Sequence, residues 1–282
     1  MSEDRFILLD AGTSRPTPVS LPPGTTVKAG VDDTEGRFTL VEYRGHDGLP
    51  DDTSDTFVYV LDGELGVDFD GETHRLTEGM CAFLPSGVTH TMRSLSDTPV
   101  HALHLSSPGS RERHVEDAEA GPTEDGESRF YLLGKGDVRP GRLRVPPAFA
   151  SKVRSTDTDD RLSLLEMVVA QQIPRHVHHR ADESIYVLDG ELVVEFVDRT
   201  YRATPGQFVL LPHGVPHALR PGSGRARRLG VFHRGPDRGQ AAHHHRRGAR
   251  RAQPEPHRRQ VRHHVRRAAL TPSTVAGAED QP

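Results

Sequence analysis

Metal-ligating side chains gather in two short segments of the chain. The segment PRHVHHRADESIYVLDG holds His176, His178 and Glu183, and His217 ends the segment LPHGVPH. Residues two apart in a strand point to the same face, so His176 and His178 can bind one metal ion. Glu183 can reach the same point from the next strand, and His217 can supply a third imidazole from another. Three imidazoles and one carboxylate suit one divalent transition metal ion, with positions left open for substrate or oxygen.

Each of these histidines has a simpler explanation when it is taken alone, because histidine is common on exposed strands. The combination of His-x-His, a carboxylate five residues later and a distant fourth ligand favours metal binding. His179 is expected on the opposite face of the strand, away from the metal. The metal stays open among Fe, Mn, Ni, Co, Cu and Zn, since affinity follows the Irving–Williams order and cellular supply as much as the ligands.

An internal repeat spans most of the chain and places this cluster in the second of two copies. At an offset of 124, residues 6–16 recur as residues 130–140, and residues 37–43 recur as residues 161–167. After three extra residues in the second copy, residues 59–90 recur as residues 186–217, with 18 identities in 32 positions. This similarity indicates a duplication.

Each copy consists of short apolar segments separated by turns. In the first copy, TFVYVL, LGVDF, CAFLP and HALHL have the lengths and alternation of half-buried antiparallel strands. The dipeptides Asp62-Gly63, Asp70-Gly71 and Glu78-Gly79 supply turns between them. The sequence therefore predicts an all-β protein made of two sandwiches or barrels of about 100 residues each.

The motif spacings resemble those of the cupin superfamily. The first cupin motif, G-x5-H-x-H-x3,4-E-x6-G, fits His176, His178, Glu183 and Gly190, and the second, G-x5-P-x-G-x2-H-x3-N, fits Gly206, Pro212, Gly214 and His217. Ala170 replaces the opening glycine and Pro221 the closing asparagine, and neither position supplies a ligand. The resemblance covers residues 6–233. It implies two tandem cupin barrels (double-stranded β-helices of jelly-roll type) and a metal held by His176, His178, Glu183 and His217.

The first copy keeps only the second motif, in Gly79, Pro85, Gly87 and His90. Leu49, Asp51 and Thr56 stand at the positions of His176, His178 and Glu183. We therefore expect a metal-free first barrel that serves as a scaffold, pairs with the second barrel or binds an organic ligand. His101 and His104 are expected to be core or rim residues, and the acidic loop of Asp51, Asp52 and Asp55 to be solvated.

Among two-barrel cupins, the segment around His176 resembles the quercetin 2,3-dioxygenase-like group. That resemblance implies an aromatic or enol-type substrate near the metal and ring-opening attack by O2, with Glu183 as the base for a substrate hydroxyl. Tyr186, Phe208 and Leu210 are candidates for the pocket wall, and ordinary core packing explains each of them as well. A cupin cyclase or isomerase of polyketide-like substrates and a non-catalytic binding protein stay open, since fold alone does not decide function.

Composition divides the chain into four parts. We predict a first barrel at residues 1–105, a charged linker at 106–128, a second barrel at 129–233 and a basic tail at 234–282. The tail holds 11 Arg, four acidic residues and one Leu, too few apolar residues for a core, so we expect it to be disordered. It is either a basic tail for anionic partners or an out-of-frame reading of GC-rich DNA, and its composition favours the second.

Charge and composition argue against several classes of protein. Residues 1–233 carry a net charge of −11 within a total of −4, which argues against a nucleic-acid partner. The chain has no run of 18 or more apolar residues, so we expect no transmembrane helix. Its acidic N-terminus lacks the features of a signal peptide. The single cysteine, Cys81, fits a reducing compartment. We therefore expect a cytoplasmic protein that binds a small molecule and O2, as a monomer or a homodimer.

Overall fold

The structure, a computed structural model, describes residues 5–17, 20–47, 49, 54–108, 130–139 and 148–234. Asp51, Asp52, most of the predicted linker and the tail beyond Arg234 lie outside these residues. The described chain consists of antiparallel strands and a short 3-10 helix, η4 (Ser155–Thr158), which confirms the all-β prediction. None of its helices is long and apolar enough to cross a membrane.

The first barrel is a sandwich of a six-stranded and a three-stranded sheet. The larger sheet has the order β10 (Tyr131–Leu133), β7 (Cys81–Leu84), β4 (Asp55–Asp62), β9 (Val100–Ser107), β3 (Thr39–Gly45) and β2 (Thr25–Ala29). The smaller sheet has the order β6 (Glu72–Thr77), β5 (Glu64–Phe69) and β8 (His90–Ser94).

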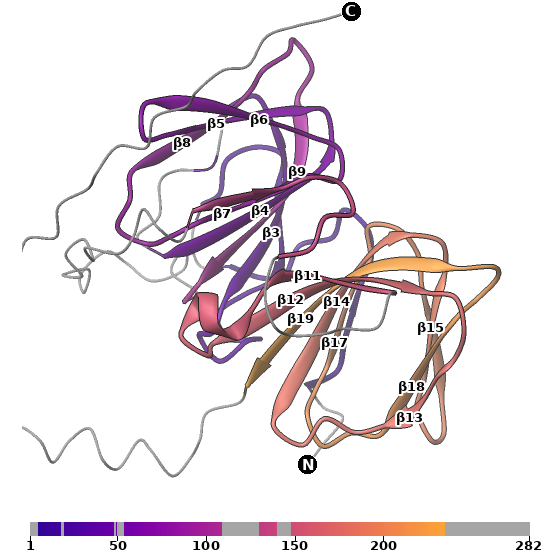
Figure 1. The fold of residues 1–282 in the computed structure, drawn as a ribbon. Helices are drawn as coiled ribbons and strands as arrows, with labels where there is room; N and C mark the ends of the chain where they lie inside the picture. The colour runs from indigo at the N-terminus through magenta and orange to yellow at the C-terminus, as the bar shows by residue number, and fades with distance from the viewer. Residues whose placement is uncertain are drawn as a thin grey trace, which may run out of the picture. The chain divides into compact units, whose positions relative to one another are not determined.

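The second barrel repeats this plan (Figure 1). Its larger sheet has the order β1 (Ile7–Leu9), β17 (Phe208–Leu211), β14 (Ala181–Asp189), β19 (Ala226–Arg234), β12 (Leu162–Val169) and β11 (Phe149–Val153). Its smaller sheet has the order β13 (Ile173–His176), β18 (His217–Pro221), β15 (Leu192–Glu195) and β16 (Thr200–Ala203). The two copies of the sequence repeat thus form two barrels of matching topology.

The barrels exchange their first strands. β1 lies N-terminal to the first barrel but forms the edge of the second barrel's sheet, with Leu9 opposite Phe208. β10 lies N-terminal to the second barrel but pairs with β7 of the first, with Leu133 opposite Cys81. These two pairings occupy equivalent positions in the repeat, so the exchange is reciprocal. The predicted domain boundaries at residues 105 and 129 stay a prediction. The larger sheet of each barrel takes its edge strand from the part of the sequence assigned to the other barrel.

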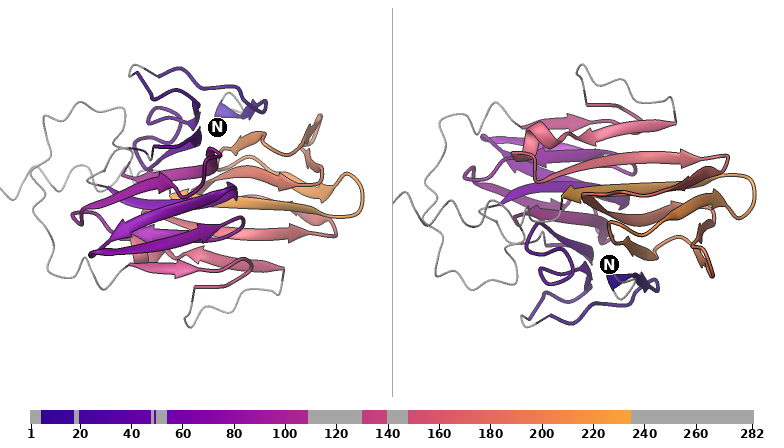
Figure 2. Two further views of the ribbon diagram at one scale, coloured as in Figure 1. Left: turned by 90° about the horizontal axis from the view of Figure 1, so that it is seen from above. Right: turned by 90° about the horizontal axis from the view of Figure 1, so that it is seen from below.

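Three apolar clusters hold this arrangement together. One fills the first barrel, with Val58, Val60 and Leu65 among its members, and another fills the second, with Ile185, Val187 and Leu219. The third combines residues from the outer faces of both larger sheets and so lies between the barrels. The strands of the two barrels overlie one another in the views of Figure 2. Strands of the larger sheets are therefore buried on both faces, so their sequences are almost continuously apolar.

Candidate metal centre

The four predicted ligands converge from three strands and one loop of the second barrel. His176 ends β13 and lies opposite His217, the first residue of β18. Glu183 lies near the start of β14, in the neighbouring sheet. His178 does not share a strand with His176 as expected, because β13 ends at His176. Its loop is anchored instead by the Gly214 amide, which donates a 2.8 Å hydrogen bond to the His178 carbonyl.

Their donor atoms form a compact cluster. One nitrogen from each imidazole and one carboxylate oxygen all lie within 4.8 Å of one another. Glu183 Oε2 is 3.3 Å from His178 Nε2 and 3.4 Å from His217 Nε2. His217 and Glu183 are buried, whereas 27% of the His178 side chain is exposed. The cluster therefore sits at an end of the barrel that solvent can reach.

Backbone hydrogen bonds set the orientation of two of the rings. His176 Nδ1 is 2.8 Å from the Pro174 carbonyl, and His217 Nδ1 is 3.0 Å from the Val215 carbonyl. Each contact requires the proton on Nδ1 and directs Nε2 to the cluster, as in metal-binding histidines. Among the described residues, Nε2 of His178, Nε2 of His217 and Oε2 of Glu183 are buried without a hydrogen-bond partner. Nitrogen and oxygen atoms that lack a hydrogen-bond partner and point to one place are suited to coordinate a divalent transition metal ion.

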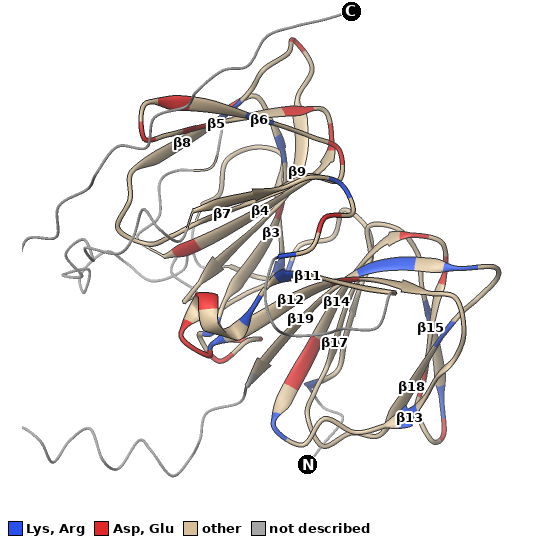
Figure 3. Cartoon of the chain, viewed as in Figure 1, with Lys and Arg blue, Asp and Glu red and all other residues tan. Residues whose placement is uncertain are grey.

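The carboxylate of Glu183 is ionised. Burial alone would raise its pKa, but the adjacent Arg228 guanidinium, together with the nearby His178 and His217 rings, outweighs burial and holds the pKa well below its usual range. Arg228 Nη1 donates to Glu183 Oε1 at 2.6 Å, with both side chains almost fully buried. In Figure 3, β14 carries acidic residues near its start and β19 carries basic residues near its own.

The imidazole of His176 favours the neutral form that metal ligation needs. The pKa of His176 is lowered by burial and by the neighbouring His217 and His178 rings, against a smaller raising effect of the Pro174 carbonyl. The three ring centroids lie 4.6 to 5.6 Å apart. His179 is exposed and lies outside the cluster.

Tyr186, Phe208 and Leu210 do not line this site. Residues of β14 alternate in direction, so Glu183 and Ile185 face the barrel interior while Tyr186 faces the other way. Tyr186, Phe208 and Leu210 belong to the cluster between the barrels, packed against Leu40, Phe57 and other residues of the first barrel. The expectation of a pocket wall is corrected accordingly: the inward-facing residues of these strands are Val209 and Leu211.

The first barrel lacks the equivalent cluster. Leu49 packs in its apolar core, and Thr56, the counterpart of Glu183, is fully buried. His90 matches His217 and makes the same Nδ1 contact, to the Val88 carbonyl at 3.1 Å. Among the described residues, the four predicted ligands of the second barrel form the only group of three or more His, Cys, Asp or Glu suited to one metal ion. Asp51 lies outside the described residues.

Arg228 was not predicted from the sequence as a residue of the site, although the pattern of β19 contains a signal for a buried charge. Positions 226, 228, 230 and 232 of β19 face the barrel interior and read Ala, Arg, Gly and Phe. A single charged residue in an otherwise apolar inward series indicates a buried ion pair. Its partner could then be sought among the acidic residues of the adjacent inward positions, which include Glu183.

Comparison with known proteins agrees with this fold. The cupin domain family model matches in both halves of the chain, at residues 35–106 and 163–232. The chain is 32% identical over 102 residues to quercetin 2,3-dioxygenase of Bacillus subtilis, covering 36% of this chain and 28% of that protein. It is 35% identical over 95 residues to polyketide synthase CurC of Streptomyces cyaneus, covering 33% of this chain and 61% of that protein. The chain thus spans less than two thirds of either relative.

Solved structures show the same architecture. The crystal structure of protein Ylba from E. coli aligns with a TM-score of 0.60 at 14% identity, covering 84% of this chain and 93% of that one. At this identity the likeness concerns the fold alone. The two matches to the family model together span half of the chain, one in each barrel. The chain belongs to the cupin domain family and carries two cupin barrels.

Proposed function

We propose that the second barrel binds one divalent transition metal ion and acts as a metal-dependent dioxygenase on a small aromatic or enol-type molecule. The observation that carries this proposal is the convergence of three imidazoles and one carboxylate with their donor atoms within 4.8 Å of one another. Three buried donor atoms of this group have no hydrogen-bond partner among the described residues. A bound cation would satisfy all of them at once.

The quercetin 2,3-dioxygenase match supports the choice of reaction. It covers 102 residues of this chain at 32% identity. When bound, a transition metal ion supplies Lewis acidity and open positions for a substrate hydroxyl and O2. The three histidines hold it, and the apolar barrel interior around Ile185 and Leu219 keeps bulk water away from the reacting group.

We assign Glu183 primarily as a metal ligand rather than as a general base. Its Oε2 faces the imidazoles, whereas Arg228 stabilises the ionised carboxylate and so weakens it as a base. Its additional role as the base for a substrate hydroxyl stays a prediction.

Oxygen uptake tests the proposed reaction. The full chain, reconstituted in turn with Fe, Mn, Co, Ni, Cu or Zn, is mixed with flavonols and catechols while dissolved O2 is recorded. We expect substrate-dependent O2 consumption with at least one metal and none in His217→Ala. Stoichiometric metal binding without O2 consumption on any of these substrates contradicts the dioxygenase.

A second candidate is a cyclase or isomerase of polyketide-like substrates that uses the metal only as a Lewis acid. The 35% identity to polyketide synthase CurC over 95 residues favours it. Conversion of a polyketide-like substrate without O2 uptake, monitored by mass spectrometry, distinguishes this reaction from the dioxygenase. Retention of a small molecule without conversion would instead identify a binding protein.

A further inference from the structure

Arg228 is a cation inside the second barrel. It lies on β19 opposite Val187, a member of the barrel's inner apolar cluster, and its exposure is 2%. Its Nη1 donates to Glu183 Oε1 at 2.6 Å, and its Nε has no hydrogen-bond partner among the described residues. Burying a guanidinium is unfavourable unless a specific partner compensates for it, so the contact with Glu183 accounts for its place.

The two oxygens of Glu183 have different partners. Oε1 accepts the Arg228 hydrogen bond, whereas Oε2 lies 3.3 Å and 3.4 Å from the Nε2 atoms of His178 and His217. A carboxylate whose two oxygens are both available can coordinate a metal through one or through both. Here Arg228 occupies one oxygen, which leaves a single oxygen facing the imidazoles.

The first barrel shows what happens to this pair where the ligands are missing. The strand registers place Ala102 opposite Val60 where Arg228 lies opposite Val187. Thr56 occupies the position of Glu183, so acid and guanidinium have been replaced together in one barrel and kept together in the other. Since both barrels form the same sandwich, the fold does not require this ion pair. The pair is present in the barrel that has the predicted metal ligands and absent from the barrel that lacks them.

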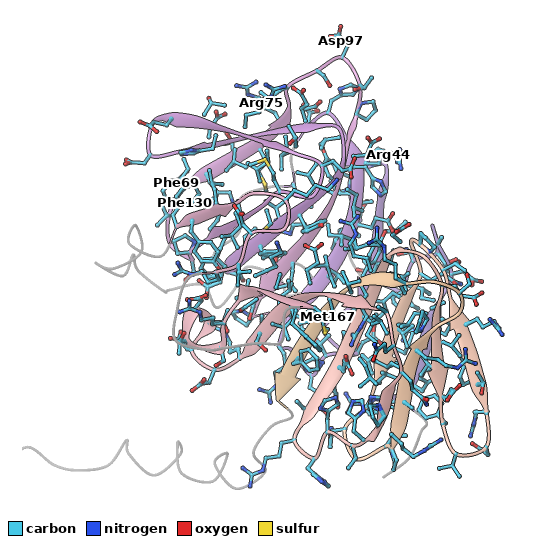
Figure 4. All side chains as sticks on the ribbon, turned by 45° about the vertical axis from the view of Figure 1, so that its right-hand side comes forward. Arg44, Phe69, Arg75, Asp97, Phe130 and Met167 are labelled. Atoms are coloured by element: carbon cyan, nitrogen blue, oxygen red, sulfur yellow. The ribbon has the colours of Figure 1, made fainter. Side chains whose placement is uncertain are left out.

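The space for the guanidinium is also specific to the second barrel. Gly230 lies two residues after Arg228, and a Cβ atom there would be 2.5 Å from Met167 Cε and 3.1 Å from Arg228 Nη1. Met167, which packs on this space from β12, is labelled in Figure 4. His104 stands at the equivalent position of the first barrel, opposite Val58 as Gly230 is opposite Ile185. The absence of a side chain at Gly230 therefore leaves room for Arg228.

We propose that Arg228 is a positioning residue that restricts Glu183 to one metal-facing oxygen and so keeps a coordination position open for an anionic ligand. This inference rests on the proposed metal site. Without the guanidinium, Oε1 is released to coordinate as well, and the open position is lost. The guanidinium also offsets the carboxylate charge, which leaves the centre more attractive to an anion such as a deprotonated enol or phenol.

Cobalt spectroscopy with azide as the anionic probe tests this role. The full chain and its variants are loaded with Co(II), the visible spectrum is recorded and azide is titrated. We expect Arg228→Met to bind Co(II), to show an altered spectrum and to bind azide at least about tenfold more weakly. Arg228→Lys, which keeps the charge and a donor, should recover part of the azide affinity.

A matched control separates this effect from the loss of any ion pair. Arg220 Nε contacts Glu195 Oε1 at 2.6 Å in the same barrel, away from the donor atoms, so Arg220→Met should retain the wild-type spectrum and azide affinity. An Arg228→Met protein with the wild-type spectrum and azide affinity overturns the inference, as does an equal loss in Arg220→Met. A wild-type chain that binds no Co(II) overturns the proposed metal site itself, which is a different result.

An infrared measurement on the wild-type chain keeps the inference testable if Arg228→Met does not fold. The difference spectrum between metal-loaded and metal-free protein reports the two carboxylate stretches of the coordinating glutamate. A wide separation between them, typical of coordination through one oxygen, is expected. A narrow separation means that both oxygens coordinate, and it contradicts the role of Arg228 whatever the variants do.

Discussion

Two histidines of the proposed metal centre, His176 and His217, use their rings in the same way, with one nitrogen held by the backbone and the other directed to the cluster. The carbonyl acceptors lie two residues before each ring, at Pro174 and Val215. Both are therefore fixed by the local chain path rather than by distant packing. This geometry costs little to maintain, since the ring needs no reorientation when a cation binds. The same contact at His90 shows that the motif orients a ring even where, among the described residues, no group of three or more metal-ligating side chains surrounds it.

At the residue scale, His217 and His90 provide a paired test. Removing His217 deletes a ligand, so His217→Ala should weaken the binding of a transition metal by more than about 100-fold, because changes behind a ligand already cost roughly 10–100-fold. His90→Ala should leave metal affinity at the wild-type value. Competition titration with a chromophoric chelator measures both. Equal losses in the two variants would mean that the first barrel holds a ligand as well.

At the scale of elements, each barrel is completed by a strand from the segment preceding the other. Phe6, just before β1, meets the Phe196 ring edge-on, with 5.2 Å between centroids, and lies tilted against the Tyr201 ring at 4.6 Å. Phe130, just before β10, stacks on Phe69 at 4.1 Å, and Figure 4 labels both rings. These aromatic contacts are repeat-related, so each exchanged strand brings its own anchor into the host barrel.

The exchange predicts a crossed pattern of destabilisation. Phe6→Ala should lower the free energy of unfolding by about 1–3 kcal/mol and raise amide exchange in β15 and β16 of the second barrel. Phe130→Ala should do the same in β5 and β6 of the first. Hydrogen exchange with mass spectrometry resolves the two barrels. If Phe6→Ala raises exchange in the first barrel instead, β1 does not belong to the second barrel's sheet.

Much of this organisation was predictable, and the remainder has physical reasons. The repeat and the cupin spacings predicted two barrels and the residues of the cluster, because turns and ligands leave local patterns. The strand exchange left no local pattern in the sequence, because residues 6–16 match residues 130–140 whichever sheet each segment joins. The direction of Tyr186 was also hidden: β14 is buried on both faces, so its sequence shows no alternation from which to assign a face.

At the scale of the whole described body, buried ion pairs repeat on both sides of the contact between the barrels. Lys28 Nζ lies 2.9 Å from Glu42 Oε2, and Lys152 Nζ lies 3.2 Å from Glu166 Oε2. Both lysines are fully buried. A cavity of about 390 Å³ lies between the barrels and is lined by Glu42, His101 and Tyr186 among others. Of these four residues, Glu42 lines that cavity.

The pair at Glu42 predicts a pH dependence of stability. Burial opposes ionisation, but hydrogen bonds from His101 and Lys28 lower the pKa of Glu42 to about 2. Because this folded-state value lies below the unfolded one, the stabilisation is complete above about pH 4.5 and is lost as the pH falls toward 2. Glu42→Gln should therefore cost about 3 kcal/mol at pH 7, and the difference from wild type should shrink across that window.

Glu78 supplies the control for this pH dependence. It contacts Lys135 at 2.8 Å with more than half of each side chain exposed, so Glu78→Gln should change the free energy of unfolding by no more than about 0.5 kcal/mol. Urea denaturation from pH 2.5 to 7 measures both variants. A Glu42→Gln deficit that stays constant over this range would show that the carboxylate charge is not the source of the stabilisation.

Metal stoichiometry is the decisive measurement for a single metal centre in the second barrel. The full chain is purified without added affinity-tag histidines, reconstituted with one transition metal, dialysed and analysed for bound metal, in parallel with His176→Ala and Glu183→Ala. We predict about one metal ion per chain, lost in both variants. Two ions per chain, or one ion that survives both substitutions, would contradict this centre, and no bound metal would contradict the metal-dependent function altogether.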